Sequence, residues 1–539
     1  MGSKSAIQVD AFRLEAALGH KQELRRGFGL FSLTSLGIII ANSWAATGGT
    51  IVTALYNGGP MAVLYGLVVV SIFYTLISAS LAELASAIPS AGGVYHWSTV
   101  VAHRYGRATG FFTGYLNACA WLLSASSISS ILGNEAVAMY LLMHPSVEWK
   151  PWQVFVVFII VLWMCCGIVC SCNRFLPMIN RIALILSMGG MFVTIIVLAV
   201  MPRGHHASNE SVWRTFHNET GWSSDSVCFL TGLLNAAFAV GVPDCISHLA
   251  EEVPRPEVKV PQGIMLQMLT AFSTSFVYLI ALFYSIQDLG AVFNSSIGYF
   301  PTAEIYLQAT GSTAGAVGLI ALLFLATFPT LIGTLVTGGR MWWSLARDKA
   351  TPFPSFFSHV NPQTQTPERA TIAMACMVSC LGVVYVGSTT AFQALISSFI
   401  VLSTLSYAGA ILPHLLTGRK NIVPGPFYLG KYGFIINAVS IVYIAVTVVF
   451  FCFPLVMPAT IRNMNYTSVI TAGLMTLVAI WWVFQGFRHY EGPIYSMEAA
   501  KRLATSSPDQ LEIGGKSTSS GEVSPKDPIS PITMENRTK

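Results

Sequence analysis

The chain has 539 residues, of which 53% are hydrophobic and only 10% are Asp, Glu, Lys or Arg. Soluble proteins carry about 25% charged residues, so this composition excludes an ordinary water-exposed surface and indicates an integral membrane protein. The net charge is only +5 and no segment forms a basic domain, which also excludes nucleic-acid binding.

Apolar segments long enough to cross a bilayer recur along the chain. No charged residue occurs between Gly27 and Ala82, or between Ala370 and Gly418. Each stretch is long enough for two spans at about 20 residues per span. Charged residues precede the first apolar run, so we expect no signal peptide. The pattern predicts an all-α membrane protein with twelve spans, near residues 31–54, 62–86, 108–132, 152–172, 182–201, 226–247, 266–286, 314–337, 370–386, 391–413, 432–454 and 468–488.

Two independent features orient these spans. Cationic loops resist translocation, so Lys and Arg collect on the cytoplasmic side. With both termini in the cytoplasm, all Lys and Arg residues fall inside except Lys150, Arg203, Arg214 and Arg462. The N-glycosylation sequence Asn-x-Ser/Thr is used only in external loops, and it occurs in loops predicted to be external at Asn209, Asn218, Asn294 and Asn465. We therefore expect a multi-pass glycoprotein of the plasma membrane with both termini in the cytoplasm.

Two spans contain residues that disfavour a continuous membrane helix. The first span reads Ala41-Asn42-Ser43-Trp44 near its midpoint, and the sixth reads Val240-Gly241-Val242-Pro243-Asp244. Pro243 cannot donate a helical hydrogen bond. Interruptions at corresponding positions, five spans apart, are typical of inverted-repeat transporters, whose broken helix ends face a substrate near the membrane midplane. The alternative is that the small residues only allow close helix packing.

The two interrupted segments are expected to form opposite sides of a substrate cavity. Aromatic faces attract ammonium groups, which makes Trp44, Trp121 and Phe238 candidate walls, although such residues also face lipid or pack in the core. We expect Gly241→Leu to fill the cavity and block transport without unfolding the protein. The predicted substrate-binding residues are Ala41, Asn42, Ser43, Trp44, Trp121, Phe238, Val240, Gly241 and Asp244.

Three carboxylates lie in or beside the predicted spans. A charge within a span costs roughly 2.5–3.5 kcal/mol on insertion scales and is usually paired or faces a cavity. Asp244 is therefore expected either to hold a cation or proton, or to cap the second half of the sixth helix. Glu83 is a second candidate for gating or coupling, with an ordinary ion pair as the alternative. Glu135, toward the outer end of the third span, is expected to be solvated.

The remaining features point away from catalysis. Most of the ten cysteines lie in apolar runs, where thiols pack as small hydrophobes, and no His, Asp and Glu cluster at ligand spacing falls within a span. We expect no enzyme activity, cofactor or metal site. The Ser- and Pro-rich C-terminal segment is predicted to be disordered. Its Lys501, Lys516 and Lys526 are candidate sites for the ubiquitin machinery.

Three segments resemble signatures of the amino acid-polyamine-organocation permeases. They are Ser80–Trp97, Asp244 with Glu251–Pro256 and Pro261, and Arg340–Asp348 with Pro352. Within that superfamily, the chain resembles the fungal amino acid/choline transporter family, which includes choline and γ-aminobutyrate permeases. That similarity rests on Asn42-Ser43-Trp44, Asn218–Trp222 and Gly425–Lys431, and it covers about residues 27–490. At Ala41-Asn42-Ser43 the chain departs from the Gly-Ser/Thr-Gly pattern of the wider superfamily.

The resemblance implies a leucine-transporter-like fold with two inverted repeats of five helices and two extra helices. The repeats would occupy residues 31–201 and 226–413, separated by an external loop at 202–225 and followed by the extra helices at 414–488. Residues 1–30 and 489–539 would be cytoplasmic tails. The implied function is proton-coupled secondary transport of a small nitrogenous solute such as an amino acid or γ-aminobutyrate. Alternatives are transport of choline or a specialised metabolite, and a transporter-like nutrient receptor.

Overall fold

The chain folds almost entirely into α-helices, as its apolar composition predicts. The computed structural model describes residues 29–202, 206–295, 297, 300–461 and 463–493, so most of both expected tails and all three tail lysines lie outside the described residues. The long helices are α2 (Leu30–Ala41), α3 (Ser43–Tyr56), α4 (Gly59–Ala87), α6 (Gly106–Met143), α7 (Pro151–Ser171), α8 (Leu176–Val200), α10 (Asp225–Val240), α11 (Pro256–Tyr284), α14 (Thr313–Arg347), α16 (Glu368–Gly387), α17 (Thr389–Leu416), α18 (Gly433–Phe450) and α19 (Thr467–Trp481).

The number of membrane helices depends on how α10 is counted. Within the described residues, 11 helices are long and apolar enough to cross a membrane, with α2 and α3 contributing one span together. Helix α10 is apolar but has only 16 residues. The all-α, multi-pass membrane architecture is confirmed, and the count of twelve spans stays a prediction.

The first membrane span changes direction at Asn42. Helix α2 ends at Ala41 and α3 begins at Ser43, because Asn42 has a left-handed backbone with φ 31°. Among residues with a side chain, Asn is one of the few that tolerate this conformation. Its side-chain amide donates to the carbonyl oxygen of Ala326 at 2.8 Å and thereby ties the bend to α14.

Helix α10 ends at Val240, and the chain then continues through turns to the 3₁₀ helix η3 (Ser247–Glu252). Backbone groups freed inside an apolar bundle must find other partners. Gln267 of α11 donates to the carbonyl oxygen of Val242 at 3.0 Å, and the Tyr407 hydroxyl of α17 lies 3.1 Å from that of Gly241. A side chain of α11 therefore replaces one of the missing helical hydrogen bonds.

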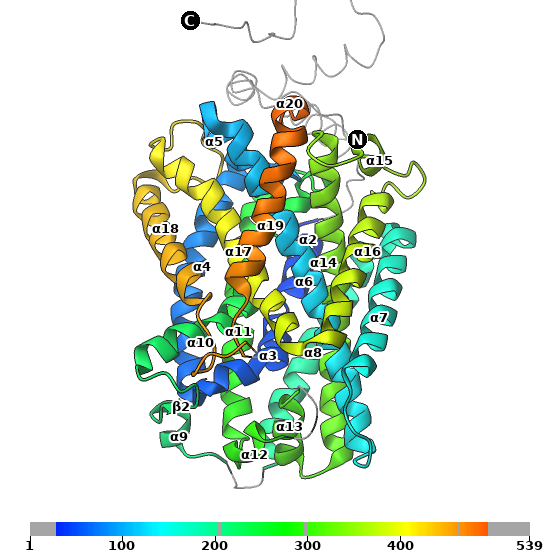
Figure 1. The fold of residues 1–539 in the computed structure, drawn as a ribbon, viewed down its shortest axis with the longest axis vertical. Helices are drawn as coiled ribbons and strands as arrows, with labels where there is room; N and C mark the ends of the chain where they lie inside the picture. Colours follow the sequence, from blue (N-terminus) through cyan, green and yellow to red (C-terminus); the bar gives the residue numbers. More distant parts are fainter. Residues whose placement is uncertain (1–28, 203–205, 296, 298–299, 462, 494–539) are drawn as a thin grey trace, which may run out of the picture. The chain divides into compact units, whose positions relative to one another are not determined.

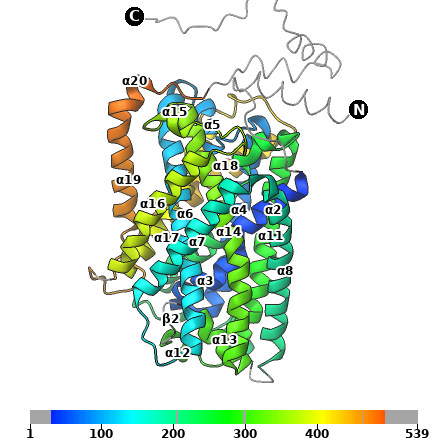
Figure 2. The same ribbon diagram turned by 90° about the vertical axis from the view of Figure 1, so that its right-hand side faces the viewer.

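The spans differ in how much of their surface is covered by protein. In its most apolar window, α6 is 89% buried, whereas the span that contains α19 is 11% buried. Figure 2 shows α19 at the edge of the bundle and α6 among the other helices. Exposed apolar side chains on α8, α18 and α19, such as Ile185, Val442 and Val469, supply a surface for lipid.

Short elements distinguish the two ends of the bundle (Figure 1). One end, called here the α5 end, carries α5 (Val94–Val101), α15 (Pro354–Phe357) and α20 (Phe487–His489). The opposite end, called the α13 end, carries α9 (Asn209–Trp213), α12 (Leu289–Phe293) and α13 (Thr302–Thr310). The α13 end also holds the only sheet of the described chain, in which β1 (Asn57–Gly58) pairs antiparallel with β2 (His217–Asn218).

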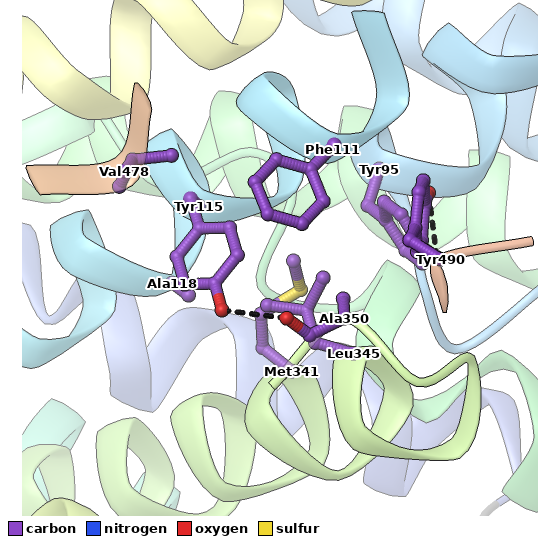
Figure 3. Packing of buried hydrophobic residues seen from close by; sticks show 9 residues of the cluster. All are labelled: Tyr95, Phe111, Tyr115, Ala118, Met341, Leu345, Ala350, Val478 and Tyr490. Carbon is purple, nitrogen blue, oxygen red and sulfur yellow. Dashed lines mark hydrogen bonds between the residues drawn. The ribbon is translucent and has the colours of Figure 1, made fainter. Parts of the chain in front are cut away.

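An aromatic cluster fastens the last span to the bundle at the α5 end. Figure 3 shows Phe111 and Tyr115 of α6 between α19 and the segment that carries Tyr490. The Tyr490 hydroxyl donates to that of Tyr95 at 3.0 Å, and Tyr115 donates to the carbonyl oxygen of Ala350 at 2.9 Å. These contacts attach the span that contains α19, which has little other protein around it, to the rest of the bundle.

Candidate functional site

A small cavity lies between the two interrupted helices and helices α6, α14 and α17. Its volume is about 30 Å³, which is room for one or two water molecules and too little for a solute with several heavy atoms. A solute can therefore bind only when the surrounding helices move apart. The described lining consists of Ile40, Ala41, Asn42, Ala45, Ala46, Ser124, Ile128, Ile131, Phe238, Val242, Thr327, Thr330 and Phe399, and it contains no charged side chain.

Of the predicted substrate-binding residues, Ala41, Asn42 and Phe238 line this cavity. Asn42, at the bend of the first span, is part of the lining. The Phe238 ring meets Phe399 of α17 edge to face, with ring centroids 5.8 Å apart. The two rings form an apolar wall opposite the α2–α3 bend. Phe399 was not predicted, because nothing in the apolar sequence of α17 distinguishes it from its neighbours.

The two predicted tryptophans pack away from the cavity lining. Trp44 is fully buried, donates its indole N–H to Ser187 at 3.1 Å and meets Tyr278 edge to face. Trp121 donates to Asp244 at 3.3 Å. Both indoles therefore have protein partners in this conformation, which fits the core-packing alternative better than a substrate wall.

Ser43, Val240 and Gly241 also lie outside the lining, although all three are buried. A Cβ atom at Gly241 would lie 2.2 Å from the carbonyl oxygen of Ala237. A larger side chain at this position would thus displace the backbone at the end of α10 before it filled the cavity. The expected effect of Gly241→Leu is corrected accordingly, because loss of folding would accompany loss of transport.

Asp244 is held by four side-chain donors from three elements. Tyr407 donates to Oδ1 at 2.6 Å, and Asn117 donates to Oδ2 at 2.8 Å. The indole N–H of Trp121 and Nε2 of His248, at 3.2 Å, also face Oδ2. No backbone amide donates to this carboxylate among the hydrogen bonds of the described chain. Asp244 therefore joins α6, α17 and η3 rather than capping the second half of the sixth span.

His248 lies between two oxygen-bearing groups. Its Nδ1 lies 2.9 Å from the carbonyl oxygen of Ala91, which only accepts hydrogen bonds. Its Nε2 faces the Asp244 carboxylate, which also accepts. His248 therefore bridges the Ala91 carbonyl oxygen and the Asp244 carboxyl group, and the two side chains lie within ion-pair distance. Neither His248 nor Asn117 was predicted, although Asn117 and Trp121 share one face of α6 by their spacing of four residues.

Glu135 differs from its expected setting and is fully buried. Its Oε1 lies 3.0 Å from the hydroxyl of Thr327, which also lines the cavity, and its Oε2 has no hydrogen-bond partner. The expectation of a solvated carboxylate is therefore wrong. It failed because the long helix α6 continues to Met143, with protein around it, beyond the predicted end of the third span.

Glu83 forms a buried ion pair near the α5 end. Its Oε1 accepts from Arg419 and from the backbone amide of Leu429, and Nε2 of His414 lies 3.7 Å from its Oε2. These contacts join α4 to the segment that follows α17. The ion-pair alternative describes the observed contacts, and a gating role for Glu83 stays a prediction.

The three segments that carried the family resemblance meet at the α5 end. Arg340 pairs with Glu252, and Arg347 pairs with Glu251 at 3.2 Å. The backbone amide of Ala91 donates to Glu251 at 3.3 Å. These contacts join α14, η3 and the loop before α5. The sequence identified the segments but not the ion pairs between them.

The same network continues to the aromatic cluster through Tyr95. Its hydroxyl donates to Asp348 at 2.8 Å. Burial, together with the nearby Asp348 carboxylate, raises the pKa of Tyr95 well above its ordinary value. The phenol therefore remains protonated and continues to donate this hydrogen bond throughout the physiological pH range.

The predicted glycosylation residues differ in accessibility. Asn209 and Asn294 are exposed, and Asn218 is half-buried in β2. Asn465 is buried, and its Nδ2 donates to the carbonyl oxygens of Phe451 and Phe453 at 2.8 and 3.0 Å. A glycan on this nitrogen does not fit the folded packing, so the structure argues against Asn465. Among the described residues, no group of three His, Cys, Asp or Glu side chains has metal-binding geometry.

Comparisons with known proteins agree with this architecture. A model of the amino acid permease family matches residues 28–475. The chain is 35% identical over 496 residues to the choline transporter of Saccharomyces cerevisiae, covering 91% of this chain and 85% of that protein. It is 27% identical over 492 residues to the amino-acid permease BAT1 of Arabidopsis thaliana, covering 88% and 95%. The manganese transporter of Eremococcus coleocola superposes with a TM-score of 0.52 at 13% identity, covering 89% of this chain and 98% of that one. At that identity the likeness concerns the fold alone, and the leucine-transporter-like fold is confirmed.

Proposed function

This chain belongs to the amino acid permease family, and we propose that it carries a small nitrogenous solute across the membrane by proton-coupled secondary transport. The observation that carries this proposal is the cavity between the two interrupted spans. In this conformation the cavity has a volume of only about 30 Å³. Solute movement then requires alternate opening toward the α13 end and the α5 end, as expected for alternating access.

The cavity lining favours a solute whose recognised group is an ammonium. Phe238 and Phe399 offer aromatic faces, which attract ammonium groups in sites that exclude water. The hydroxyls of Ser124, Thr327 and Thr330 supply neutral hydrogen-bonding groups. Amino acids, γ-aminobutyrate and choline all carry an ammonium, so this feature alone is compatible with each of them.

A second observation favours choline among these solutes. The described cavity lining contains no Lys, Arg or His to pair with a carboxylate. Choline lacks a carboxylate, and the relative that is 35% identical to this chain is a choline transporter. We therefore propose choline as the first substrate to test. An amino acid would have to place its carboxylate on free backbone amides of the interrupted helices.

The test is accumulation of labelled choline, γ-aminobutyrate and a panel of amino acids by cells that express this chain and lack their own choline uptake. We expect saturable choline uptake that excess unlabelled choline abolishes and amino acids do not. Preferential uptake of an amino acid would identify that amino acid, rather than choline, as the substrate. In vesicles, binding without accumulation of any labelled solute would instead identify a receptor and contradict transport.

We propose a plasma-membrane location. We also propose that both termini lie in the cytoplasm, which the distribution of Lys and Arg between the loops supports. In that arrangement Lys501, Lys516 and Lys526 are available to the ubiquitin machinery. Truncation after Ala500 removes all three and should prolong residence at the cell surface. Unchanged turnover in a surface-labelling chase would contradict the ubiquitin proposal without affecting the assignment as a transporter.

A further inference from the structure

Glu135 is a buried carboxylate that takes part in none of the ion pairs of the described helices. It lies one helical turn beyond Ile131 on the same face of α6, and Ile131 lines the cavity. Thr327, its hydrogen-bond partner on α14, lines the cavity as well. Glu135 therefore lies directly behind the cavity wall, toward the α13 end. Its Oε2 is buried without a hydrogen-bond partner.

The Thr327 hydroxyl indicates which form of Glu135 fits this packing. Its Oγ lies 3.0 Å from Glu135 Oε1 and 2.9 Å from the carbonyl oxygen of Leu323. A hydroxyl has one hydrogen to donate, so it satisfies only one of two acceptors. If Glu135 carries a proton, its O–H donates to Thr327, and Thr327 donates to Leu323. Both contacts are then made, whereas an ionised Glu135 leaves one of them without a hydrogen.

Among the described residues, no ion pair joins Glu135 to a Lys, Arg or His side chain. The phenols of Tyr278 on α11 and Tyr306 on α13 interact electrostatically with Glu135 and are hydrogen-bonded to each other at 2.8 Å. Tyr385 of α16 contacts the neighbouring Asn134, and Cys165 lies on α7. Charged or titratable groups elsewhere on the helices that pack against α6 have other partners, namely Arg340 with Glu252, Arg347 with Glu251, Tyr95 with Asp348, Tyr407 with Asp244, His414 with Glu83, and Arg369 with the Phe356 ring.

Asp244, the other buried carboxylate beside the cavity, has the opposite environment. Four donors face its two oxygens, and one of them is the His248 side chain. Donors of this kind favour the charged form of a carboxylate, so Asp244 is suited to remain ionised through the cycle. Glu135 has a single hydroxyl partner and an unsatisfied oxygen. Of these two carboxylates, Glu135 is the one whose charge would be buried without partners unless it takes up a proton.

We propose that Glu135 is the proton-binding residue of the transport cycle, an inference that rests on the proposed proton-coupled transport. When the α13 end is open, water reaches the carboxylate and a proton from that side converts it to the neutral acid. Closure around the bound solute with Glu135 ionised would bury an unpaired charge, so the loaded closed state selects the protonated form. When the α5 end opens, water enters the cavity beside Thr327, and Glu135 returns its proton to that side as the carboxylate. The empty carrier then returns with Glu135 ionised and hydrated by water in the space that the solute has left, so one proton crosses in each cycle.

The test uses the full-length protein in proteoliposomes, with the labelled solute that the wild type accumulates. Two processes are measured, namely accumulation driven by an imposed pH gradient and counterflow exchange without a gradient. Glu135→Gln mimics the neutral acid, so it should lose at least tenfold in pH-driven accumulation while retaining exchange. Glu148→Gln is the matched control. It removes an exposed carboxylate beyond the same end of α6, and both processes should remain unchanged.

Each result bears on the proposal. Wild-type accumulation that ignores the pH gradient would refute proton coupling itself, which is a failure of the proposed function. Normal coupling in the wild type together with normal coupling in Glu135→Gln would overturn the role of Glu135 alone. Loss of exchange as well as accumulation in well-folded Glu135→Gln would place the carboxylate in the solute site and also overturn it. If Glu135→Gln does not reach the membrane, Glu135→Asp decides, because a shifted pH profile of uptake supports the role and an unchanged profile contradicts it.

Discussion

At the scale of single residues, Asp244 shows how a charge is stabilised inside an apolar bundle. An isolated carboxylate would be unstable there, but four side chains with donor groups, one of them the buried His248, surround this one. The donors come from separate helices, so the charge also fixes where those helices lie relative to the interrupted sixth span. The carboxyl group of Glu135, which has one hydroxyl partner, has a different role because its surroundings differ.

Replacement of Asp244 by Asn should destabilise the protein more than replacement of Tyr407 by Phe. The Asn amide would direct N–H groups at other donors and remove the carboxylate that lies within ion-pair distance of His248. Removal of one partner from a buried ion pair costs about 3–5 kcal/mol. Tyr407→Phe removes one hydrogen bond to a charged group, at about 1.5–3 kcal/mol. Thermal melting in detergent, followed by size-exclusion chromatography, measures the order, and equal melting temperatures for the two variants would contradict it.

At the scale of the elements, buried ion pairs join segments that lie far apart in sequence. Arg340 on α14 and Glu252 in η3 are both almost fully buried, whereas Lys349 and Glu491 form a pair whose side chains are 55% and 75% exposed. The desolvation of a buried pair makes the loss of either partner costly, while water screens an exposed pair. Only the first pair therefore contributes strongly to holding α14 and η3 together at the α5 end.

Glu252→Gln should reduce the stability of the closed α5 end, and Glu491→Gln should not. The substitution at Glu252 would leave the Arg340 guanidinium buried without a counter-charge, at an expected loss of about 3–5 kcal/mol. The matched substitution at Glu491 removes the same charge from an exposed pair, so its melting temperature should equal that of the wild type. Accessibility of a cysteine introduced at Ala91 to a membrane-permeant thiol reagent reports opening. Equal labelling in the two variants would show that the buried pair does not hold this end closed.

At the scale of the whole molecule, hydropathy predicted the spans best where helices face lipid. It predicted the third span to end at residue 132, yet α6 continues to Met143 and is 89% buried in its apolar window. The residues just beyond the predicted end include Asn134 and Glu135, which contact protein rather than lipid, so a lipid-based scale stops too early. The predicted span 314–337 likewise stops before Arg340 of α14, which is buried against Glu252. For Thr327 and Thr330 of α14, which line the cavity, the signal was a polar residue every three or four positions on one helix face.

Contacts between distant segments were the part of the site that the sequence did not predict. Glycine, proline and Asn located both interrupted segments, because these residues act on the local backbone. The partners of Asp244 come from α6, α17 and η3, and no local pattern connects them. The orientation of the loops stays a prediction; it rests on the charge of each loop alone, because each loop is translocated on its own.

The orientation and the packing together predict which sequons carry glycans. The elements that contain or precede Asn209, Asn218 and Asn294 lie together at the α13 end (Figure 1), and two of these side chains are exposed. If that end is external, Asn209→Gln and Asn294→Gln should each remove one glycan-sized step from the electrophoretic mobility shift caused by deglycosylation. Asn465→Gln should leave that shift unchanged, because the Asn465 amide is buried and bonded to two carbonyl oxygens. A change in the shift from Asn465→Gln would show that this loop is glycosylated before it packs. Absence of any shift in the wild type, together with labelling of a cysteine at Asn294 only after the membrane is permeabilised, would reverse the orientation.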